Sequence, residues 1–595
     1  MCAVSGTLKR SLLLIAAAVI VYWNASSNPF LFDDFGAIVN NPTIRQINGG
    51  TLSPPAATPV SGRPLSNLSF AASYSIGGMD AAAFRALNLA MHIGCALFLL
   101  ALLGRLLTCA GVANAEWVAF AVALLWVVHP INSEPVDYLT QRTESLMALF
   151  FLKAMYASLR SLQGKDPGRW KTMAVVSVIA GVFAKETIAV VPLLVVAMDR
   201  AFAFPSFPAA FRARWRFYTA LSLVWVVLAF NLLRDGQTFS SGFSSAGVSP
   251  WAYLLNQPAI ILEYLKLTAW PVALVSYYGW PVRDLTIASV WPAGAIVLLL
   301  LTLSLVAVAR WPRAGFAAVW FWVILAPTSS IVPIATEVGA ERRMYLPVAA
   351  VLALIVVLFS RAFRRYKVPE SAAAATLLIV AALLSWRTIE RNREYASALR
   401  LAETTLDRWP TANAHYLVGV ELAAAGRHEE AVMHLRESAR GYPASRFYLG
   451  SEYLTLRRPD EAIAELSAFV DAEPRLVATT RARLMMAQAY VSKGDSAHAI
   501  AEAERVLAAS PNDADAHGML ANLLAEKQDF AGAVPHYQHF LASRPNNAAA
   551  WTGLGIALVA AGDMRTAIGA FQKAAEIEPG NQQYQANLAR ATAGK

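Results

Sequence analysis

Cysteine, charged residues and nucleotide-binding motifs are scarce or missing in this sequence, and each absence excludes a class of protein. Of its 595 residues only 3 are cysteines, which gives no basis for a disulfide framework or a cysteine-ligated metal site. Charged residues make up 15% and hydrophobic residues 56% of the chain, outside the range of a soluble globular protein. No GxxxxGKS or GxxxxGKT phosphate loop occurs, so a nucleoside-triphosphate site is not indicated. These absences leave an integral membrane protein.

Apolar segments recur through the first part of the chain. They lie at 11–23, 85–107, 117–130, 143–160, 172–184, 186–201, 217–233, 288–309, 315–334, 344–360 and 372–386. We expect a membrane span at each of them, roughly eleven in all. The first segment follows Lys9 and Arg10 and has no small-residue cleavage site, so we expect a retained helix and a cytoplasmic N-terminus.

The basic residues agree with this topology. The formal charge is +10, but the basic residues form short clusters between apolar segments, which favours membrane orientation over nucleic-acid binding. A crossing at every segment puts all the dense clusters on the cytoplasmic face. The segment 251–274 contains Glu263, Lys266 and two prolines, and a span there would invert everything after it. We therefore expect this segment to lie flat at the outer interface.

The same topology gathers the unusual polar residues at the outer face. Ionisable side chains at that depth are costly unless they are paired or used, so their convergence suggests a functional site. Asp33 and Asp34 open the set, in a first outer loop (24–84) of roughly sixty residues. A solvated pair or a helix cap is the alternative for two adjacent aspartates. The other members are Arg63, His129, Glu134, Arg142, Lys185, Glu186, Glu337, Glu341 and Arg342.

A repeat with a period of about 34 residues begins after Trp386. Prolines close its units at Pro410, Pro443, Pro474, Pro511, Pro545 and Pro579, and a glycine or alanine recurs where two helices must pack closely, at Gly419, Gly450, Ala487, Ala521 and Gly555. This is the tetratricopeptide (TPR) pattern, which predicts an α-solenoid over 391–595 with a partial unit at 391–410. An odd number of spans places the solenoid beside the acidic pair, where its groove would hold a protein partner.

Six short stretches carry a family resemblance. They are FDDFGAIVNNP (32–42), GRPLSNLSF (62–70), FRALNLAMH (84–92), HPINSEPVDYLTQRTESL (129–146), AKETIAVVPL (184–193) and GAERRMYLP (339–347). Together with the repeats, and in the same order, they resemble the transmembrane and TPR-repeat-containing protein O-mannosyltransferases. These are relatives of the GT-C glycosyltransferases, which use a sugar carried on a polyprenyl phosphate. The resemblance extends over nearly the whole chain.

The resemblance implies roles for particular residues. Asp33 and Asp34 match the acidic catalytic pair of the family, carried on its first outer loop. The further matches are Asn88, His92, His129, Pro130, Ile131, Glu134, Arg142, Glu144, Lys185, Glu186, Glu341 and Arg342. Two positions depart from the pattern: Arg85 replaces a frequent histidine, and Gln141 replaces a glycine. These departures bear on the identity of the sugar more than on the type of reaction.

The residue types suit that chemistry. Attack of a protein hydroxyl on an anomeric carbon needs a base, and a carboxylate beside an apolar wall has its basicity raised by desolvation, so Asp33 or Asp34 fits. The leaving lipid phosphate calls for fixed cations, for which Arg342, Arg142 and Lys185 are the candidates. With these cations no metal or other cofactor is strictly required. The remaining donor-site candidates are Arg63, Asn88, His92, His129, Glu134, Glu186 and Glu341.

Structural roles compete with these assignments. Arg142 with Glu144, and Glu341 with Arg342, also fit ion pairs that lock helix ends. His129 precedes a proline at the end of a segment, where a helix-terminating turn is expected. Asn88 and His92 are four residues apart on one helical face, which suits hydrogen bonds between helices.

Taken together, the sequence predicts an all-α protein with a GT-C-type transmembrane domain at 1–390 and a TPR solenoid at 391–595. We expect it to transfer a sugar from a polyprenyl-phosphate carrier to serine or threonine hydroxyls of a protein held by the repeats. The expected location is a bacterial inner membrane with the repeats in the periplasm. A membrane-anchored TPR scaffold without catalysis is the alternative. A transporter is disfavoured because 11–386 shows no internal repeat.

Overall fold

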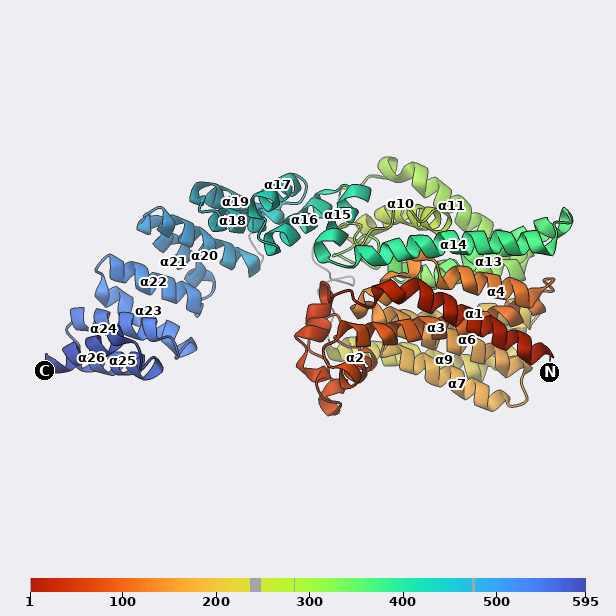
Figure 1. Ribbon diagram of the computed structural model, residues 1–595, viewed down its shortest axis with the longest axis horizontal. Coiled ribbons are helices and arrows are strands. Elements are labelled where there is room, and N and C mark those ends of the chain that lie inside the picture. Colours follow the sequence, from red (N-terminus) through yellow and green to blue (C-terminus); the bar gives the residue numbers. More distant parts are fainter. Residues whose placement is uncertain (1, 236–247, 283, 473–476, 595) are drawn as a thin grey trace. The chain divides into compact units, whose positions relative to one another are not determined.

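The computed structural model describes residues 2–235, 248–282, 284–472 and 477–594 (Figure 1). Within these ranges the chain forms helices and no β-strand, which confirms the all-α class. It divides into two compact units, Met1–Pro410 and Thr411–Lys595.

Each apolar segment expected from the sequence coincides with a helix of the first unit. These helices are α1 (Cys2–Tyr22), α3 (Ala81–Cys109), α4 (Ala115–Val127), α6 (Arg142–Gln163), α7 (Pro167–Val182), α8 (Val191–Phe202), α9 (Phe207–Asp235), α11 (Ile287–Arg310), α12 (Pro312–Leu325), α13 (Pro347–Arg365) and α14 (Glu370–Glu394). Among the described residues, 6 helices are long and apolar enough to cross a membrane alone. A bent pair, Ala115–Val127 with Pro130–Asp137, raises the number to at most 7. The chain is therefore a membrane protein, and the larger count of spans stays a prediction.

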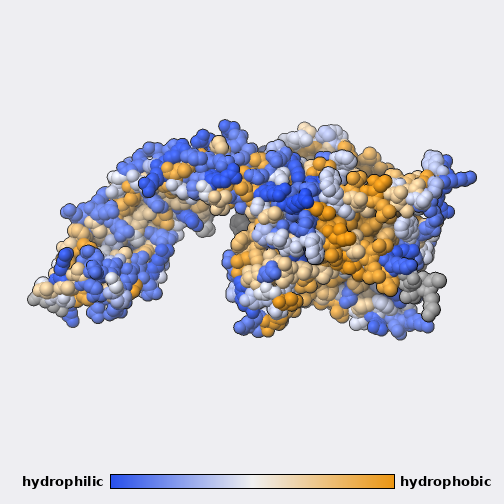
Figure 2. Space-filling view, in the orientation of Figure 1, coloured by the Kyte–Doolittle hydropathy of each residue, from blue (hydrophilic) through white to orange (hydrophobic). Residues whose placement is uncertain are grey.

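Helix α4 lies at the centre of the first unit. All its residues from Val118 to Val127 are buried, because α3, α13, α1 and α14 pack around it. Trp126 is fully enclosed and donates its indole N–H to the backbone oxygen of Tyr345 at 2.8 Å. The outer helices instead expose large apolar side chains, such as Leu298 and Leu305 of α11. Figure 2 shows hydrophobic surface gathered over this unit, the kind of surface that lipid covers.

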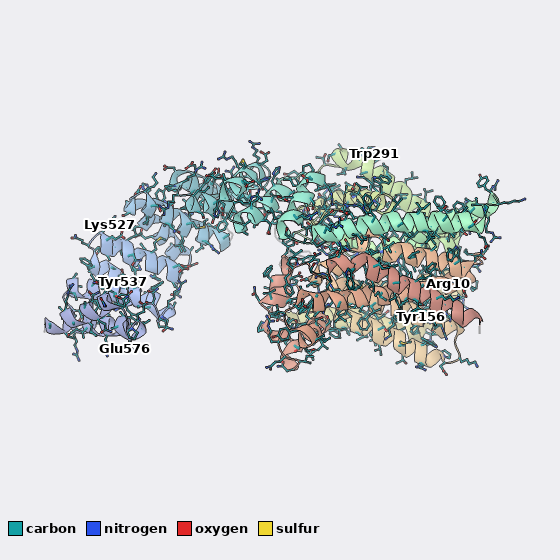
Figure 3. All side chains as sticks on the ribbon, viewed as in Figure 1. Arg10, Tyr156, Trp291, Lys527, Tyr537 and Glu576 are labelled. Atoms are coloured by element: carbon teal, nitrogen blue, oxygen red, sulfur yellow. The ribbon has the colours of Figure 1, made fainter. Side chains whose placement is uncertain are left out.

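One end of the first unit is basic. Arg10 of α1 pairs with Glu116 of α4 at 2.5 Å, and Arg160 of α6 donates to the hydroxyl of Tyr156 at 3.2 Å. Figure 3 shows Arg10 and Tyr156 at the same end of the helices. Two of the basic clusters that the sequence places on one side of the membrane therefore share one end of the unit.

The segment 251–274 forms α10 (Pro250–Ala269) and a short stretch after it. The Ser249 hydroxyl caps the helix by accepting from the backbone N–H of Ala252 at 3.1 Å. Tyr253 and Tyr264 are fully buried, whereas Trp251 and Trp270, at the two ends, are exposed. Exposed tryptophans at both ends suit a position near a membrane interface, and the flat orientation stays a prediction.

The second unit consists of paired helices, as the repeat predicts. They are α16 (Ala412–Ala424), α17 (His428–Ala439), α18 (Ser445–Thr455), α19 (Pro459–Ala472), α20 (Val477–Ser492), α21 (Ser496–Ala509), α22 (Ala514–Glu526), α23 (Phe530–Ser543), α24 (Ala548–Ala560), α25 (Met564–Ile577) and α26 (Gln582–Ala593). The glycines lie where helices touch. A Cβ on Gly450 would stand 2.5 Å from Leu466 Cγ, and one on Gly555 2.6 Å from Phe571 Cε1. Small residues are therefore required for the two helices of a repeat to approach.

Helix α15 (Ala398–Arg408) is part of the first unit, although the sequence assigns it to a partial repeat. The division between compact units falls after Pro410, twenty residues beyond the expected boundary at 390/391. Helix α14 also runs past that boundary, to Glu394. The segment 391–410 thus packs with the apolar helices despite its repeat-like sequence.

Candidate active site

The acidic pair lies in the loop that follows α1, where the backbone turns sharply. Phe32 has φ of +43°, a left-handed conformation that side chains disfavour. This turn separates the two carboxylates: Asp33 is exposed and Asp34 is completely buried. The two aspartates therefore differ in their environment: Asp33 faces solvent and Asp34 faces the protein interior.

Asp34 holds the loop in place. Its Oδ1 accepts from the backbone N–H and the hydroxyl of Thr140 at 2.7 and 2.5 Å, and its Oδ2 accepts from the N–H of Leu31 at 3.0 Å. Burial raises the pKa of Asp34 to about 6, although these hydrogen bonds oppose the rise. Both oxygens are thus engaged within the protein, which makes Asp34 a structural carboxylate.

Asp33 presents its carboxylate to the outside. Its backbone N–H donates to the hydroxyl of Tyr138 at 2.9 Å, which fixes the residue in the loop. The surrounding protein desolvates the carboxylate and raises its pKa, while Tyr138 and the charge of Arg342 oppose the rise. Asp33 therefore has the accessibility and the raised basicity of a general base.

Arg342 is fixed between two carboxylates close to Asp33. Its guanidinium donates to Glu134 at 2.7 Å and to both oxygens of Glu337 at 2.6 Å, and its backbone N–H donates to Glu134 at 2.9 Å. Burial raises the pKa of Glu337, but Arg342 and Arg343 outweigh that effect and bring it to about 2. Glu337 thus stays ionised, and the charge of Arg342 is already compensated.

A narrow hollow with a volume of about 20 Å³, little more than one water molecule needs, lies beside this cluster. Its polar lining includes Lys185, Glu144 and Arg343, and the Lys185 ammonium lies 2.6 Å from the Glu144 carboxylate. Arg343 also pairs with Glu337 at 3.1 Å, so Glu337 joins the hollow to Arg342. The apolar lining is Met147, Phe151, Ile324 and Leu346. The site therefore combines fixed cations with apolar walls.

Arg343 was missed by the sequence analysis. The stretch GAERRMYLP contains two adjacent arginines, and the resemblance singles out only Arg342. A signal was available, since a second arginine at the edge of an apolar segment is as costly as the first. The structure places Arg343 toward the hollow and Arg342 between carboxylates.

Arg63 and Glu186 form a more exposed pair. One guanidinium nitrogen of Arg63 contacts both carboxylate oxygens of Glu186, at 3.0 and 3.1 Å. The pair ties the start of α2 (Pro64–Gly77) to the 3-10 turn Glu186–Val190, next to Lys185. Glu186 is half exposed, so it borders the site while Arg63 closes the loop onto it.

The side chains of Arg142 and Asn88 make contacts within the fold, which favours a structural role over the part in donor binding expected from sequence. Arg142 is fully buried and donates to Asn88 Oδ1 and to the backbone oxygens of Ser69 and Phe84, at 2.6 to 2.7 Å. It also stacks over the Phe70 ring at 4.5 Å. With these contacts Arg142 binds α2, α3 and α6 together and presents no donor to a ligand.

His92 and His129 are likewise buried inside the fold rather than in a donor site. His92 contacts the Tyr345 hydroxyl at 2.8 Å and the Val127 oxygen at 3.0 Å, so it links three helical segments. His129 caps the 3-10 turn Pro130–Asn132 by accepting from the N–H of Ile131, and its Nε2 lies 3.0 Å from the Thr268 oxygen. The helix-to-helix and turn roles considered from sequence are the ones observed.

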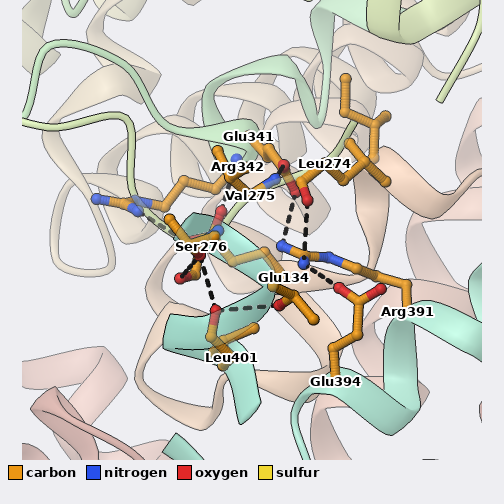
Figure 4. A network of polar contacts seen from close by, with 12 residues as sticks. Glu134, Leu274, Val275, Ser276, Glu341, Arg342, Arg391, Glu394 and Leu401 are labelled. Atoms are coloured by element: carbon orange, nitrogen blue, oxygen red, sulfur yellow. Dashed lines mark hydrogen bonds and ion pairs between the residues drawn. The ribbon is translucent and has the colours of Figure 1, made fainter. Parts of the chain in front are cut away.

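Glu341 is also internal. It accepts from the backbone N–H of Val275 at 2.5 Å and pairs with the buried Arg391 at 3.3 Å (Figure 4). Burial raises its pKa to about 8. It therefore braces the loop before Arg342 instead of meeting a ligand. Among the described residues, no three histidine, cysteine, aspartate or glutamate side chains are arranged to hold a metal ion.

Comparison with known proteins finds similarity in both parts of the chain. The tetratricopeptide repeat family matches residues 390–446, 447–514, 484–539 and 519–582. The protein O-mannosyl-transferase F38B6.6 of Caenorhabditis elegans is 25% identical over 71% of this chain and 61% of its own length. Protein O-mannosyl-transferase TMTC1 of Mus musculus is 26% identical, over 72% of this chain and 58% of its own. The chain resembles the TMTC protein O-mannosyl-transferases.

That similarity confirms the resemblance seen in the six stretches. For the human TMTC1 the identity is 25%, over 72% of this chain and 55% of the relative. The chain thus spans between 55% and 61% of the length of these relatives. Among solved structures, a MamA protein matches 29% of this chain at 20% identity and a TM-score of 0.27. The TPR protein YrrB matches 31% at 15% identity and a TM-score of 0.28.

Proposed function

We propose that the chain is a membrane glycosyltransferase that moves a sugar, as a mannosyltransferase does, from a polyprenyl-phosphate carrier to a serine or threonine hydroxyl of a protein. One observation carries the proposal. Of two adjacent aspartates, Asp34 is buried and accepts hydrogen bonds from Thr140 and Leu31, whereas Asp33 is exposed and within electrostatic reach of Arg342. The names of the relatives agree with protein O-mannosylation.

In this mechanism Asp33 is the general base. Its carboxylate takes the proton of the acceptor hydroxyl as the oxygen attacks the anomeric carbon. A glycosidic bond forms, the bond between that carbon and the phosphate oxygen breaks, and the lipid phosphate leaves with the electron pair. A pKa raised by desolvation favours this proton transfer. Asp34 and Tyr138 hold the loop that carries the base.

We place the carrier's phosphate at the hollow, beside Lys185 and Arg343. The apolar walls there suit the first part of a polyprenyl chain, and the two cations suit the negative charge that grows on the leaving phosphate. Each cation already faces a carboxylate, Glu144 or Glu337, and Arg343 also donates to the Tyr253 hydroxyl and to the backbone oxygens of Thr328 and Val338. The phosphate would compete with these partners. Arg342, compensated by Glu134 and Glu337, orients the loop next to Asp33. These cations replace a metal in the proposal, so transfer should persist in EDTA.

The topology belongs to the same proposal. A cytoplasmic N-terminus puts the basic end of the first unit in the cytoplasm and Asp33, with the repeats, on the periplasmic side of a bacterial inner membrane. The repeats then hold the protein acceptor. A reporter fused after Lys367 should read as cytoplasmic, and one fused after Ala396 as periplasmic. Reversal of either result would contradict the orientation.

The decisive experiment compares Asp33→Asn and Asp34→Asn in the full chain, with a radiolabelled polyprenyl-phosphate mannose and a protein acceptor. Asp33→Asn keeps the size of the side chain and removes its basicity, so transfer should fall by about 10²- to 10⁴-fold while donor binding is retained. Asp34→Asn should lower the yield of folded protein, because an amide cannot accept all three hydrogen bonds. An active Asp33→Asn enzyme would end the proposal and favour the membrane-anchored scaffold.

A further inference from the structure

Helix α15 packs against the loop that carries Asp33 and Asp34. Leu401 of α15 packs with Leu31 and Tyr395 in a small buried cluster, and all three are nearly inaccessible to solvent. Phe32 and Tyr138 border this cluster. These are the residue before Asp33 and the residue whose hydroxyl receives the N–H of Asp33. We call Leu31, Phe32, Tyr138, Tyr395, Ala398 and Leu401 the loop platform. The position of Asp33 therefore depends on α15.

Polar contacts fix α15 on its other side. Arg408 donates to both carboxylate oxygens of Glu394, at 2.6 and 2.8 Å, and to the backbone oxygen of Leu274 at 2.7 Å. The Thr405 hydroxyl lies 3.0 Å from that of Ser276. A bidentate arginine pair with a buried carboxylate is a specific and directional contact. Helix α15 is thus clamped at its C-terminal end as well as at its apolar face.

The contacts of Arg408 continue through buried side chains to the residue next to Arg342. Glu394 pairs with Arg391 at 2.5 Å, Arg391 pairs with Glu341, and Glu341 accepts from the N–H of Val275 (Figure 4). Glu341 directly precedes Arg342 in the turn Glu341–Met344. One chain of contacts therefore joins Arg408 to the residue next to Arg342, while the loop platform joins Leu401 to Asp33.

We propose that α15 is a positioning element of the active site, with Leu401 setting the place of Asp33 and Arg408 setting that of the Glu341–Met344 turn. This inference rests on the proposed function. Neither residue touches a substrate in the proposal; each acts through others. A displacement of about 1 Å at a reacting group costs on the order of 10²-fold in rate, so loosening α15 should slow transfer without removing the donor site.

Two substitutions in the full-length protein test this inference. Leu401→Ala opens space beneath Leu31 and Phe32, and Arg408→Gln removes the bidentate contact. Leu401→Ala should lower kcat for mannosyl transfer at least tenfold and leave the KM for the polyprenyl-phosphate donor within about twofold. Arg408→Gln should also lower kcat at least tenfold and should raise that KM, because the turn that it positions carries Arg343 of the donor site. Leu401→Met, which keeps most of the volume, should restore kcat. The acidic limb of the pH profile of kcat should also shift in Leu401→Ala, because the surroundings of Asp33 change.

The matched controls are Leu399→Ala and Arg400→Gln on the same helix, since Leu399 is outside the platform and Arg400 is exposed. Both should behave as the wild type. A kcat of Leu401→Ala and Arg408→Gln equal to these controls would overturn the inference. If Leu401→Ala does not fold, the kcat values of Leu401→Val and Arg408→Gln are compared with those of the controls instead. Asp33→Asn is measured alongside: inactive Asp33→Asn with fully active α15 variants refutes only the positioning role, whereas active Asp33→Asn refutes the proposed function.

Discussion

Both units contain exposed ion pairs, but fully buried pairs between distant elements are found in the first unit. In the repeats, pairs such as Arg427–Glu430 and Arg440–Glu437 join neighbouring turns of one helix and stay close to half exposed or more. In the first unit, Arg391 and Glu341 are 50 residues apart, both are buried, and they belong to different elements. The same kind of contact is therefore solvated in Arg427–Glu430 and enclosed by protein in Arg391–Glu341.

Burial changes what such a pair does. An exposed pair contributes roughly 0 to 1 kcal/mol, because water solvates each partner nearly as well as the other partner does. A buried pair gains little over an apolar replacement of both partners, but loss of one partner leaves a charge without compensation and costs about 3 to 5 kcal/mol. The buried pairs therefore specify which segments meet, and the exposed pairs do not.

The largest effect should come from breaking the buried network. Arg391→Leu removes the partner of both Glu341 and Glu394, so we expect the thermal unfolding temperature in detergent to fall sharply or folding to fail. Arg427→Leu in the repeats should change stability by less than about 1 kcal/mol. Comparable losses in both variants would show that burial does not separate the two kinds of pair.

Much of the fold was predictable from sequence because its signals are local. Helix positions follow from apolar runs, and the repeats follow from a period that brings Gly450 against Leu466 within one unit. Helix α15 lies within the tetratricopeptide match at 390–446, so its sequence is that of a repeat helix, although it groups with the first compact unit. Its contacts with Leu31 and Glu394 lie far along the chain or outside the repeat pattern, so no local signal separates it from the solenoid.

The site was predictable only in part. Sequence reasoning marks a polar residue at membrane depth as costly, but it does not say what satisfies that residue. Arg142 is satisfied by hydrogen bonds to backbone oxygens. His129 is satisfied by capping a turn, and Glu341 is satisfied by its pair with a buried arginine. Distinguishing these from Asp33 and Lys185 requires the partners, which lie far along the chain, 208 residues away in the case of Arg342 and Glu134.

A smaller effect should come from the packing between repeat helices. Gly450→Ala places a Cβ about 2.5 Å from Leu466 Cγ, so the helices must separate or Leu466 must change rotamer, at a cost of roughly 1 to 3 kcal/mol. Gly569→Ala in α25 meets nothing within 4 Å and should stabilise its helix by about 0.5 to 1 kcal/mol. Hydrogen exchange of the repeat amides in the full-length protein measures both. Stabilisation by Gly450→Ala would contradict the close-approach account.

Histidine pairs add a finer contrast within the repeats. His415 Nδ1 lies 3.1 Å from His434 Nδ1, and the pair His517–His536 at 2.8 Å has the same 19-residue separation. The intervening repeats instead carry ion pairs at that separation, Arg446–Glu465 among them. Two facing imidazole nitrogens form a hydrogen bond when one of them carries a proton, but they repel each other when both do. An arginine and a glutamate, by contrast, attract each other at any pH near neutral.

The smallest expected effect is therefore a dependence of the stability of the repeats on pH. Burial and the neighbouring His434 lower the pKa of His415, although Glu437 opposes this. The unfolded chain then binds more protons than the folded one below about pH 6.5, so stability is highest above that pH and falls on acidification. Replacing His415 and His434 by the Arg and Glu of the next repeat should flatten the profile of amide exchange in α16 and α17 between pH 7 and 5. An unchanged profile would mean that the pair does not titrate in this range.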